Sequence, residues 1–153
     1  MPISETLQPT RGVIHDPSAS GLELAYDGDA ATFCALSENT EGQVAAVTWD
    51  DFPDGAIPAN KRESVIARVK CGWTTTDTND KISVYARAVD GDPWSLMAYA
   101  KYPNTFSPAA YVDVDVTDVI GQEPMSSLDI QVVFGNGATG DPDNPDPPIP
   151  HGV

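Results

Sequence analysis

The stretch Val65–Trp73, VIARVKCGW, decides the fold class of this chain. Its residues alternate strictly, with Val65, Ala67, Val69, Cys71 and Trp73 on one side and Ile66, Arg68, Lys70 and Gly72 on the other. Alternation with a period of two residues is typical of a β-strand that has one buried face and one solvated face. The stretch therefore predicts an antiparallel sheet packed against a core.

Similar alternation recurs on both sides of this stretch. It appears at Leu22–Tyr26, Ile82–Ala88, Val112–Val116 and Leu128–Phe134. Gln43–Trp49, rich in Val, Thr and Trp, and Trp94–Tyr99 are further strand candidates. Turn signals such as Asp54-Gly55 and Asp90-Gly91 separate these runs, and only Thr117–Gly121 suggests a short helical turn. We therefore predict an all-β fold, a single jelly-roll β-sandwich of about eight antiparallel strands. The predicted core comprises Val69, Trp73, Val84, Val114, Ile130 and Val132.

The composition divides the chain into three parts. Residues 1–20 are predicted to be an extended N-terminal arm, residues 21–135 the sandwich, and residues 136–153 a Pro/Asp-rich tail. The tail holds five of the 14 prolines and too little apolar surface to fold alone. It is either an arm that lies along a neighbouring subunit or a disordered tail without a partner. Ile149 and Val153 are its only sizeable apolar anchors.

The charge balance excludes several classes of partner. The chain has 23 acidic and 8 basic residues, a formal net charge of -15. Nucleic acid and anionic membranes repel such a polyanion, so we expect neither as a partner. No apolar run is long enough to span a bilayer. The first residues, MPISETLQPTRG, lack the pattern of a signal peptide, so we expect synthesis in a cytoplasm.

The segment around Asp27-Gly28-Asp29 is the candidate metal site. The carboxylates of Asp27 and Asp29 and the hydroxyl of Thr32 are oxygen ligands of the kind that Ca²⁺ prefers. A structural Ca²⁺ is therefore the one cofactor considered. The alternative is an ordinary Asp-Gly turn with solvated carboxylates. The acidic turn Asp90-Gly91-Asp92 is a weaker candidate of the same kind.

The titratable residues do not predict an enzyme. The two histidines, His15 and His151, lie in the predicted arm and tail, away from any structured nucleophile in the sequence. No glycine-rich loop precedes a helix in the way that phosphate binding requires. Cys34 and Cys71 are either buried free thiols or a disulfide pair, and the sequence leaves both readings open.

Two segments resemble a known family. Ala25-Tyr26-Asp27-Gly28-Asp29 followed by Thr32-Phe33, and Val89–Trp94, are similar to segments of discoidin-like, galactose-binding-like β-sandwiches. The likeness extends over Leu22–Phe134. It implies a jelly roll, a sugar site in the loops at one end, and in several members a structural Ca²⁺ in the early loop. Here Phe33 stands where that family usually has tryptophan, and the three tryptophans fit a core better than a sugar platform.

The overall plan of the chain resembles the small accessory virion proteins of tailed bacteriophages. The likeness lies in an acidic β-sandwich with extended terminal arms, and no single motif carries it. It implies a structural virion protein, a capsid decoration or a neck or tail component, that contacts other virion proteins and self-associates. The rival expectation is a non-catalytic carbohydrate-binding module of the galactose-binding-like type, with a cell-surface glycan as its partner.

Overall fold

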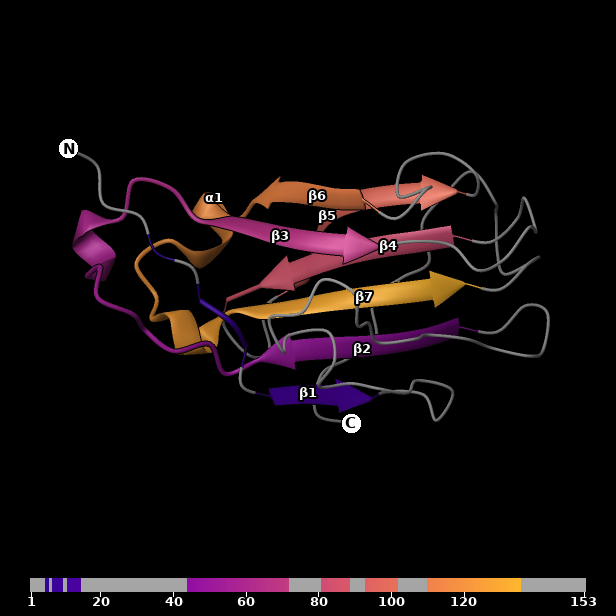
Figure 1. Ribbon diagram of the computed structural model, residues 1–153, viewed down its shortest axis with the longest axis horizontal. Coiled ribbons are helices and arrows are strands. Elements are labelled where there is room, and N and C mark those ends of the chain that lie inside the picture. The colour runs from indigo at the N-terminus through magenta and orange to yellow at the C-terminus, as the bar shows by residue number, and fades with distance from the viewer. Residues whose placement is uncertain are drawn as a thin grey trace.

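A computed structural model describes residues 5, 7–9, 11–14, 44–71, 81–88, 93–101 and 110–135 (Figure 1). These residues form seven strands: β1 Arg11–Ile14, β2 Val44–Asp50, β3 Ile66–Cys71, β4 Lys81–Arg87, β5 Ser95–Lys101, β6 Ala110–Asp115 and β7 Asp129–Gly135. Three short helical turns accompany them: η2 Ala59–Lys61, α1 Thr117–Ile120 and η3 Met125–Ser127. Among the described residues, the predicted all-β character and the helical turn near Thr117 are confirmed, whereas η2 and η3 were not predicted.

The strands form two antiparallel sheets. The larger sheet has five strands in the order β1-β2-β7-β4-β5, and the smaller sheet pairs β3 with β6. β7, the last described strand, lies between β2 and β4 because its apolar alternation matches both neighbours in register. Val132, for example, is opposite Val47 on one side and Val84 on the other. The non-sequential order places segments far apart in the chain side by side (Figure 1).

One hydrophobic core connects the two sheets. Its buried residues come from the five-stranded sheet, from β6 and from the segment between β6 and β7: Ile82, Val84, Ala86, Ala88, Ala100, Val114, Val116, Ile120, Met125, Leu128, Ile130 and Val132. Four of the predicted core residues, Val84, Val114, Ile130 and Val132, are therefore confirmed. Val69 is half-buried and packs against the same cluster. Trp73 lies outside the described residues.

The N-terminal part of the chain contains a strand that the sequence did not predict. Arg11–Ile14 was expected within an extended arm, but it pairs with β2 as the edge of the larger sheet. Such a short run carries too little alternation to be distinguished from an irregular lead-in. The predicted strand Leu22–Tyr26 and the tail 136–153 lie outside the described residues.

The polar positions of the larger sheet are a second departure from expectation. Every side chain of β4 is buried, including Lys81, Ser83 and Arg87. On β7, Asp129 and Gln131 are buried as well. Alternation of polar and apolar residues normally marks a solvated face, yet here both faces of these central strands are shielded from water. The polar residues must then find partners within the protein.

Candidate functional site

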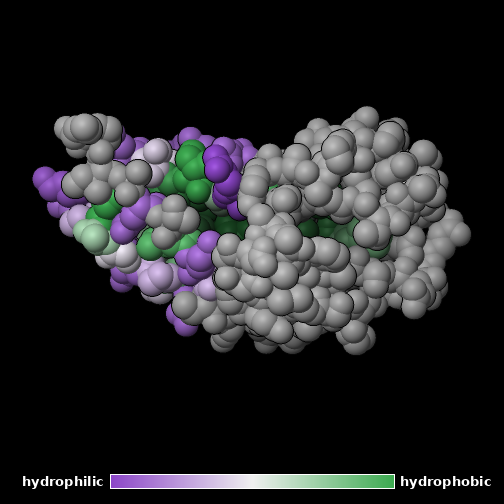
Figure 2. Space-filling model, in the orientation of Figure 1, coloured by the Kyte–Doolittle hydropathy of each residue, from purple (hydrophilic) through white to green (hydrophobic). Residues whose placement is uncertain are grey.

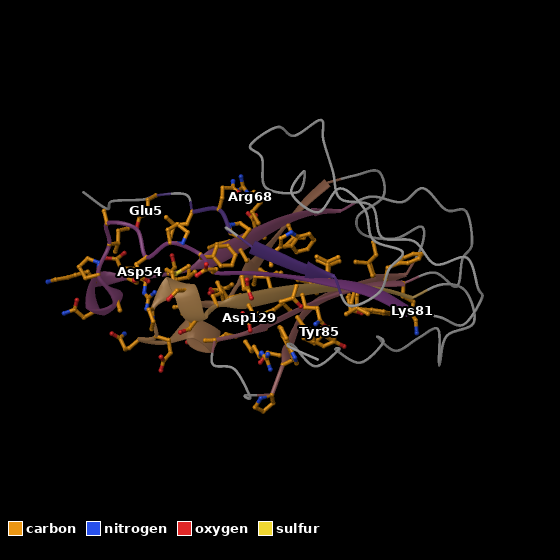
Figure 3. All side chains as sticks on the ribbon, turned by 90° about the horizontal axis from the view of Figure 1, so that it is seen from below. Glu5, Asp54, Arg68, Lys81, Tyr85 and Asp129 are labelled. Atoms are coloured by element: carbon orange, nitrogen blue, oxygen red, sulfur yellow. The ribbon has the colours of Figure 1, made fainter. Side chains whose placement is uncertain are left out.

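Two regions of the described structure could carry function. The first is the covered polar face, the side of the larger sheet that faces away from the main core. Its members are Ala46, Thr48, Asp50, Lys81, Ser83, Tyr85, Arg87, Asp129, Gln131 and Val133, all of them buried. Figure 3 shows Tyr85 between Asp129 and Lys81 along this sheet. A smaller apolar cluster of Ala46, Tyr85 and Val133 lies among the polar groups, and Trp94 packs against it.

Register explains how two pairs of polar side chains on the covered polar face bond to each other. Thr48 is opposite Gln131, whose amide Nε2 donates a hydrogen bond of 3.0 Å to the threonine Oγ1. Arg87 is opposite Asp129, and its Nε donates to Oδ2 over 3.1 Å. The guanidinium of Arg87 also lies 4.3 Å from the centroid of the Trp94 ring, a cation–π contact.

The chemistry of this face is that of a structural network. Arg87 and Asp129 neutralise each other, and the ring of Trp94 covers the cation. The hydroxyl of Ser83 and the indole N–H of Trp94 are buried with no hydrogen-bond partner among the described residues. Neither is joined to a base that could activate it. The described contacts of this face therefore join β2, β4 and β7 through their side chains.

The second region is the tethered end, where Glu5, the loop 51–62 and the segment 117–127 meet (Figure 1). The loop begins at Asp51, whose φ of 56° is in the left-handed region that Asp tolerates better than most residues. Side chains then join the loop to the other segments. Asp54 Oδ1 accepts a 2.9 Å hydrogen bond from the backbone N–H of Met125. Arg62 donates to the carbonyl oxygens of Gly121 and Glu123 over 3.1 and 2.6 Å.

Glu5 fills a carboxylate-binding turn in this end. Its two oxygens accept hydrogen bonds of 2.9–3.1 Å from the backbone N–H groups of Ala56 and Ile57. Gly55, with φ of +70°, turns these N–H groups toward one point. Successive N–H groups in such a turn form an anion-binding concavity. A Cβ on Gly55 would lie 2.7 Å from Cδ of Glu5, so a larger residue here would displace the carboxylate of Glu5 from the turn. We call this contact the Glu5 latch.

The outer face of the β3–β6 sheet is exposed and carries a cross-strand ion pair. Arg68 donates through Nε and a second guanidinium nitrogen to the two oxygens of Asp113, over 2.8 and 3.1 Å. This hydrogen bonding lowers the pKa of Asp113. The hydroxyl and the backbone N–H of Thr117 bond to Asp115 and lower its pKa likewise. Ile66 lies opposite Asp115 and is exposed, an apolar side chain near charged ones. Figure 2 shows hydrophobic and hydrophilic side chains next to one another on the described part of the surface in this view.

The structure does not test the site residues predicted from sequence. Asp27, Asp29 and Thr32, together with Ile149 and Val153, lie outside the described residues, as do the turn 90–92 and Cys34. The Ca²⁺ site and the anchors in the tail stay predictions. Among the described residues, no group of three or more His, Cys, Asp or Glu could hold a metal ion. Nor does that part of the chain contain a helix with the length and apolar character of a membrane crossing.

The sequence analysis missed the Glu5 latch and the Arg87–Asp129 pair. Asp54-Gly55 was predicted to be a turn, but no local signal links it to Glu5, which lies far away in the sequence. The pairing of Arg87 with Asp129 depends on β7 lying beside β4, which strand alternation alone cannot specify. No family model, curated protein or solved structure shows significant similarity to the chain.

Proposed function

We propose that this chain is a structural protein of a tailed-bacteriophage particle, a capsid decoration or a neck or tail accessory component. It acts through protein–protein contacts with other virion proteins and with copies of itself. It is made in the host cytoplasm and resides in the virion. We also propose that its two antiparallel sheets belong to a jelly-roll sandwich of about eight strands.

The observation that supports this proposal most is the way the N-terminal segment is held. The described residues of this segment, 5, 7–9 and 11–14, dock through the Glu5 latch, through Leu7 against the main core, and through β1 on the edge of β2. These are the contacts by which an extended peptide binds a folded domain: backbone pairing, one apolar anchor and a captured charge. A domain that receives an extended segment in this way is suited to assembly through its arms.

The polar chemistry of the described residues agrees with a non-catalytic role. The buried ion pair Arg87–Asp129 is joined across two strands, and the exposed pair Arg68–Asp113 spans two others. Each charged group therefore has a partner that stabilises strand pairing. A general acid or base must be positioned to exchange a proton with a substrate. In these two pairs each charged group is instead bonded to its partner residue.

A carbohydrate-binding module of the galactose-binding-like type is the alternative. Such a module needs an aromatic ring exposed in a loop to stack on a sugar. Trp49 is half-buried against the main core, and Trp94 is half-buried beneath the guanidinium of Arg87. These two rings serve packing, so they favour the structural role over the sugar platform. A glycan array with the intact protein distinguishes the two functions, since the proposal predicts no specific glycan.

The test of the proposed role uses the C-terminal tail. Deleting residues 140–153 should leave the sandwich folded, because the tail has too little apolar surface to contribute to a core. It should weaken attachment to particles, since proline-stiffened segments lose little entropy on docking. The matched control is Ile149→Ser with Val153→Ser, which removes only the apolar anchors. A truncated protein that loads onto particles as well as the full chain would contradict the tail's role.

A further inference from the structure

We propose that residues 5–14, here called the strap, also dock in the same place on a second copy of this chain. The product is a strand-exchanged dimer in which β1 of each copy pairs with β2 of the other. This inference concerns self-association only, so it does not depend on whether the protein belongs to a virion.

The contacts of the strap are made with parts of the chain that lie far from it in sequence. The carboxylate of Glu5 binds the N–H groups of Ala56 and Ile57, and Leu7 packs against the main core. β1 pairs with β2 in antiparallel register, from Arg11 opposite Asp50 to Ile14 opposite Val47. Each contact would be the same if the strap came from another copy. Exchange therefore forms a dimer with little change in the free energy of the contacts.

The length of the connection between β1 and β2 allows docking between chains to compete with docking within one chain. Antiparallel neighbours are often joined by a tight hairpin that holds them together, but residues 15–43 separate these two strands. The effective concentration of a tethered segment is on the order of millimolar for a short flexible linker and falls as the linker becomes longer. Docking between chains therefore competes with docking within a chain once the protein reaches that concentration.

The acceptor surface is specific for the strap. β2 pairs with β7 on its other side, so without β1 its backbone N–H and C=O groups would form an open edge. An open edge accepts an added strand. The carboxylate-binding turn at Gly55–Ile57 then selects a strap with an acidic residue at the position of Glu5. A second copy of this chain supplies the strand, the apolar anchor and the carboxylate in the matching order.

A disulfide trap tests the exchange with full-length chains. Val13 and Thr48 are register partners, and backbones at such positions are about 4.5–5.5 Å apart, within reach of a disulfide. One chain carries Val13→Cys and the other Thr48→Cys, and both have Cys34 and Cys71 replaced by serine. Mixed at about 1 mM and oxidised, they should form a covalent heterodimer whose fraction falls steeply on dilution to about 1 µM. A single chain with both cysteines is the control, and it should close on itself when dilute.

Three results would overturn the inference. The first is the absence of the heterodimer under conditions in which the doubly substituted chain closes. The second, independent of any cysteine, is an unmodified chain that sediments as a monomer at about 1 mM. The third comes from Glu5→Ala, which removes the same latch from monomer and dimer and should leave their ratio unchanged. A many-fold loss of dimer in that variant would indicate a different interface.

Discussion

Arg87 and Asp129 face each other across β4 and β7, with 3.1 Å between Nε and Oδ2 and with side chains only 6% and 8% exposed. Removing one member of a buried ion pair leaves the other charge without compensation, which typically costs about 3–5 kcal/mol. Replacing both members with apolar residues avoids that penalty. The pair should therefore show strong coupling in a double-mutant cycle.

We expect Arg87→Met to lower the free energy of unfolding by about 3–5 kcal/mol and Arg87→Met with Asp129→Leu to recover part of that loss. Chemical denaturation of the single and double variants measures both effects. Arg68→Met is the matched control, because the Arg68–Asp113 pair is exposed and solvent screening makes the contribution of such pairs small. Equal losses for Arg87→Met and Arg68→Met would contradict the buried ion pair.

The main core should respond to lost volume according to burial. Val132 is buried between the two sheets and Val69 is half-buried at the edge of the same cluster. Val132→Ala should lower the free energy of unfolding by about 1–3 kcal/mol, because it removes apolar contacts and leaves a cavity. Val69→Ala should lower the free energy of unfolding by distinctly less than Val132→Ala does. Denaturation midpoints in the reverse order would show that the core does not lie between the sheets at Val132.

The Glu5 latch predicts non-additive effects at Gly55. Glu5→Ala should cost about 1 kcal/mol for the lost charge-assisted hydrogen bonds. Gly55→Ala should cost more than Gly121→Ala, because both glycines have positive φ but only Gly55 lies against a side chain. With Glu5→Ala already present, the two glycine variants should become alike. Thermal melts of the single and double variants measure these stabilities. If Gly55→Ala lowers the stability by the same amount whether residue 5 is Glu or Ala, the latch is contradicted.

The exposed carboxylates predict a specific pH dependence. Hydrogen bonding from Arg68 holds the pKa of Asp113 below its ordinary value of about 3.9. Stability from this contact is thus present above the ordinary pKa and is lost as the pH falls through the lowered one. In a carboxyl NMR titration, Arg68→Met should raise the midpoint of Asp113 and leave Asp115 in place. Thr117→Val should raise the midpoint of Asp115 and leave that of Asp113 in place, because Thr117 lowers the pKa of Asp115. If the titration midpoint of Asp113 is the same in the Arg68→Met variant as in the unmodified chain, the ion pair is contradicted.

Alternation predicted the strand content because it is a local property of the sequence. Val112, Val114 and Val116 needed only their neighbours to be recognised as alternating; β6 contains the first two, and Val116 follows its end as the residue that precedes α1. The order of the strands depends on contacts between segments far apart, so the position of β7 between β2 and β4 was beyond such reasoning. Burial of polar residues was missed for the same reason, since nothing local distinguishes the covered Arg87 from the exposed Arg68.

The predicted site residues stay predictions, and the Glu5 latch was not predicted. Residue type and spacing pointed to Asp27 and Asp29, which the described residues do not include. The Glu5 latch instead uses backbone N–H groups, which leave almost no trace in a sequence beyond the glycine at position 55. Asp54-Gly55 predicted a turn. The carboxylate that binds there belongs to Glu5, and only the tertiary fold brings Glu5 close to this turn.

We propose that this protein is part of a phage particle and works through contacts with other virion proteins. The decisive measurement is peptide mass spectrometry of phage particles purified on a density gradient from cells that also produce this chain. The account predicts that the chain is present in intact particles at a fixed ratio to the major capsid protein. Its absence from particles, with the protein left in the soluble fraction of the lysate, would contradict the account.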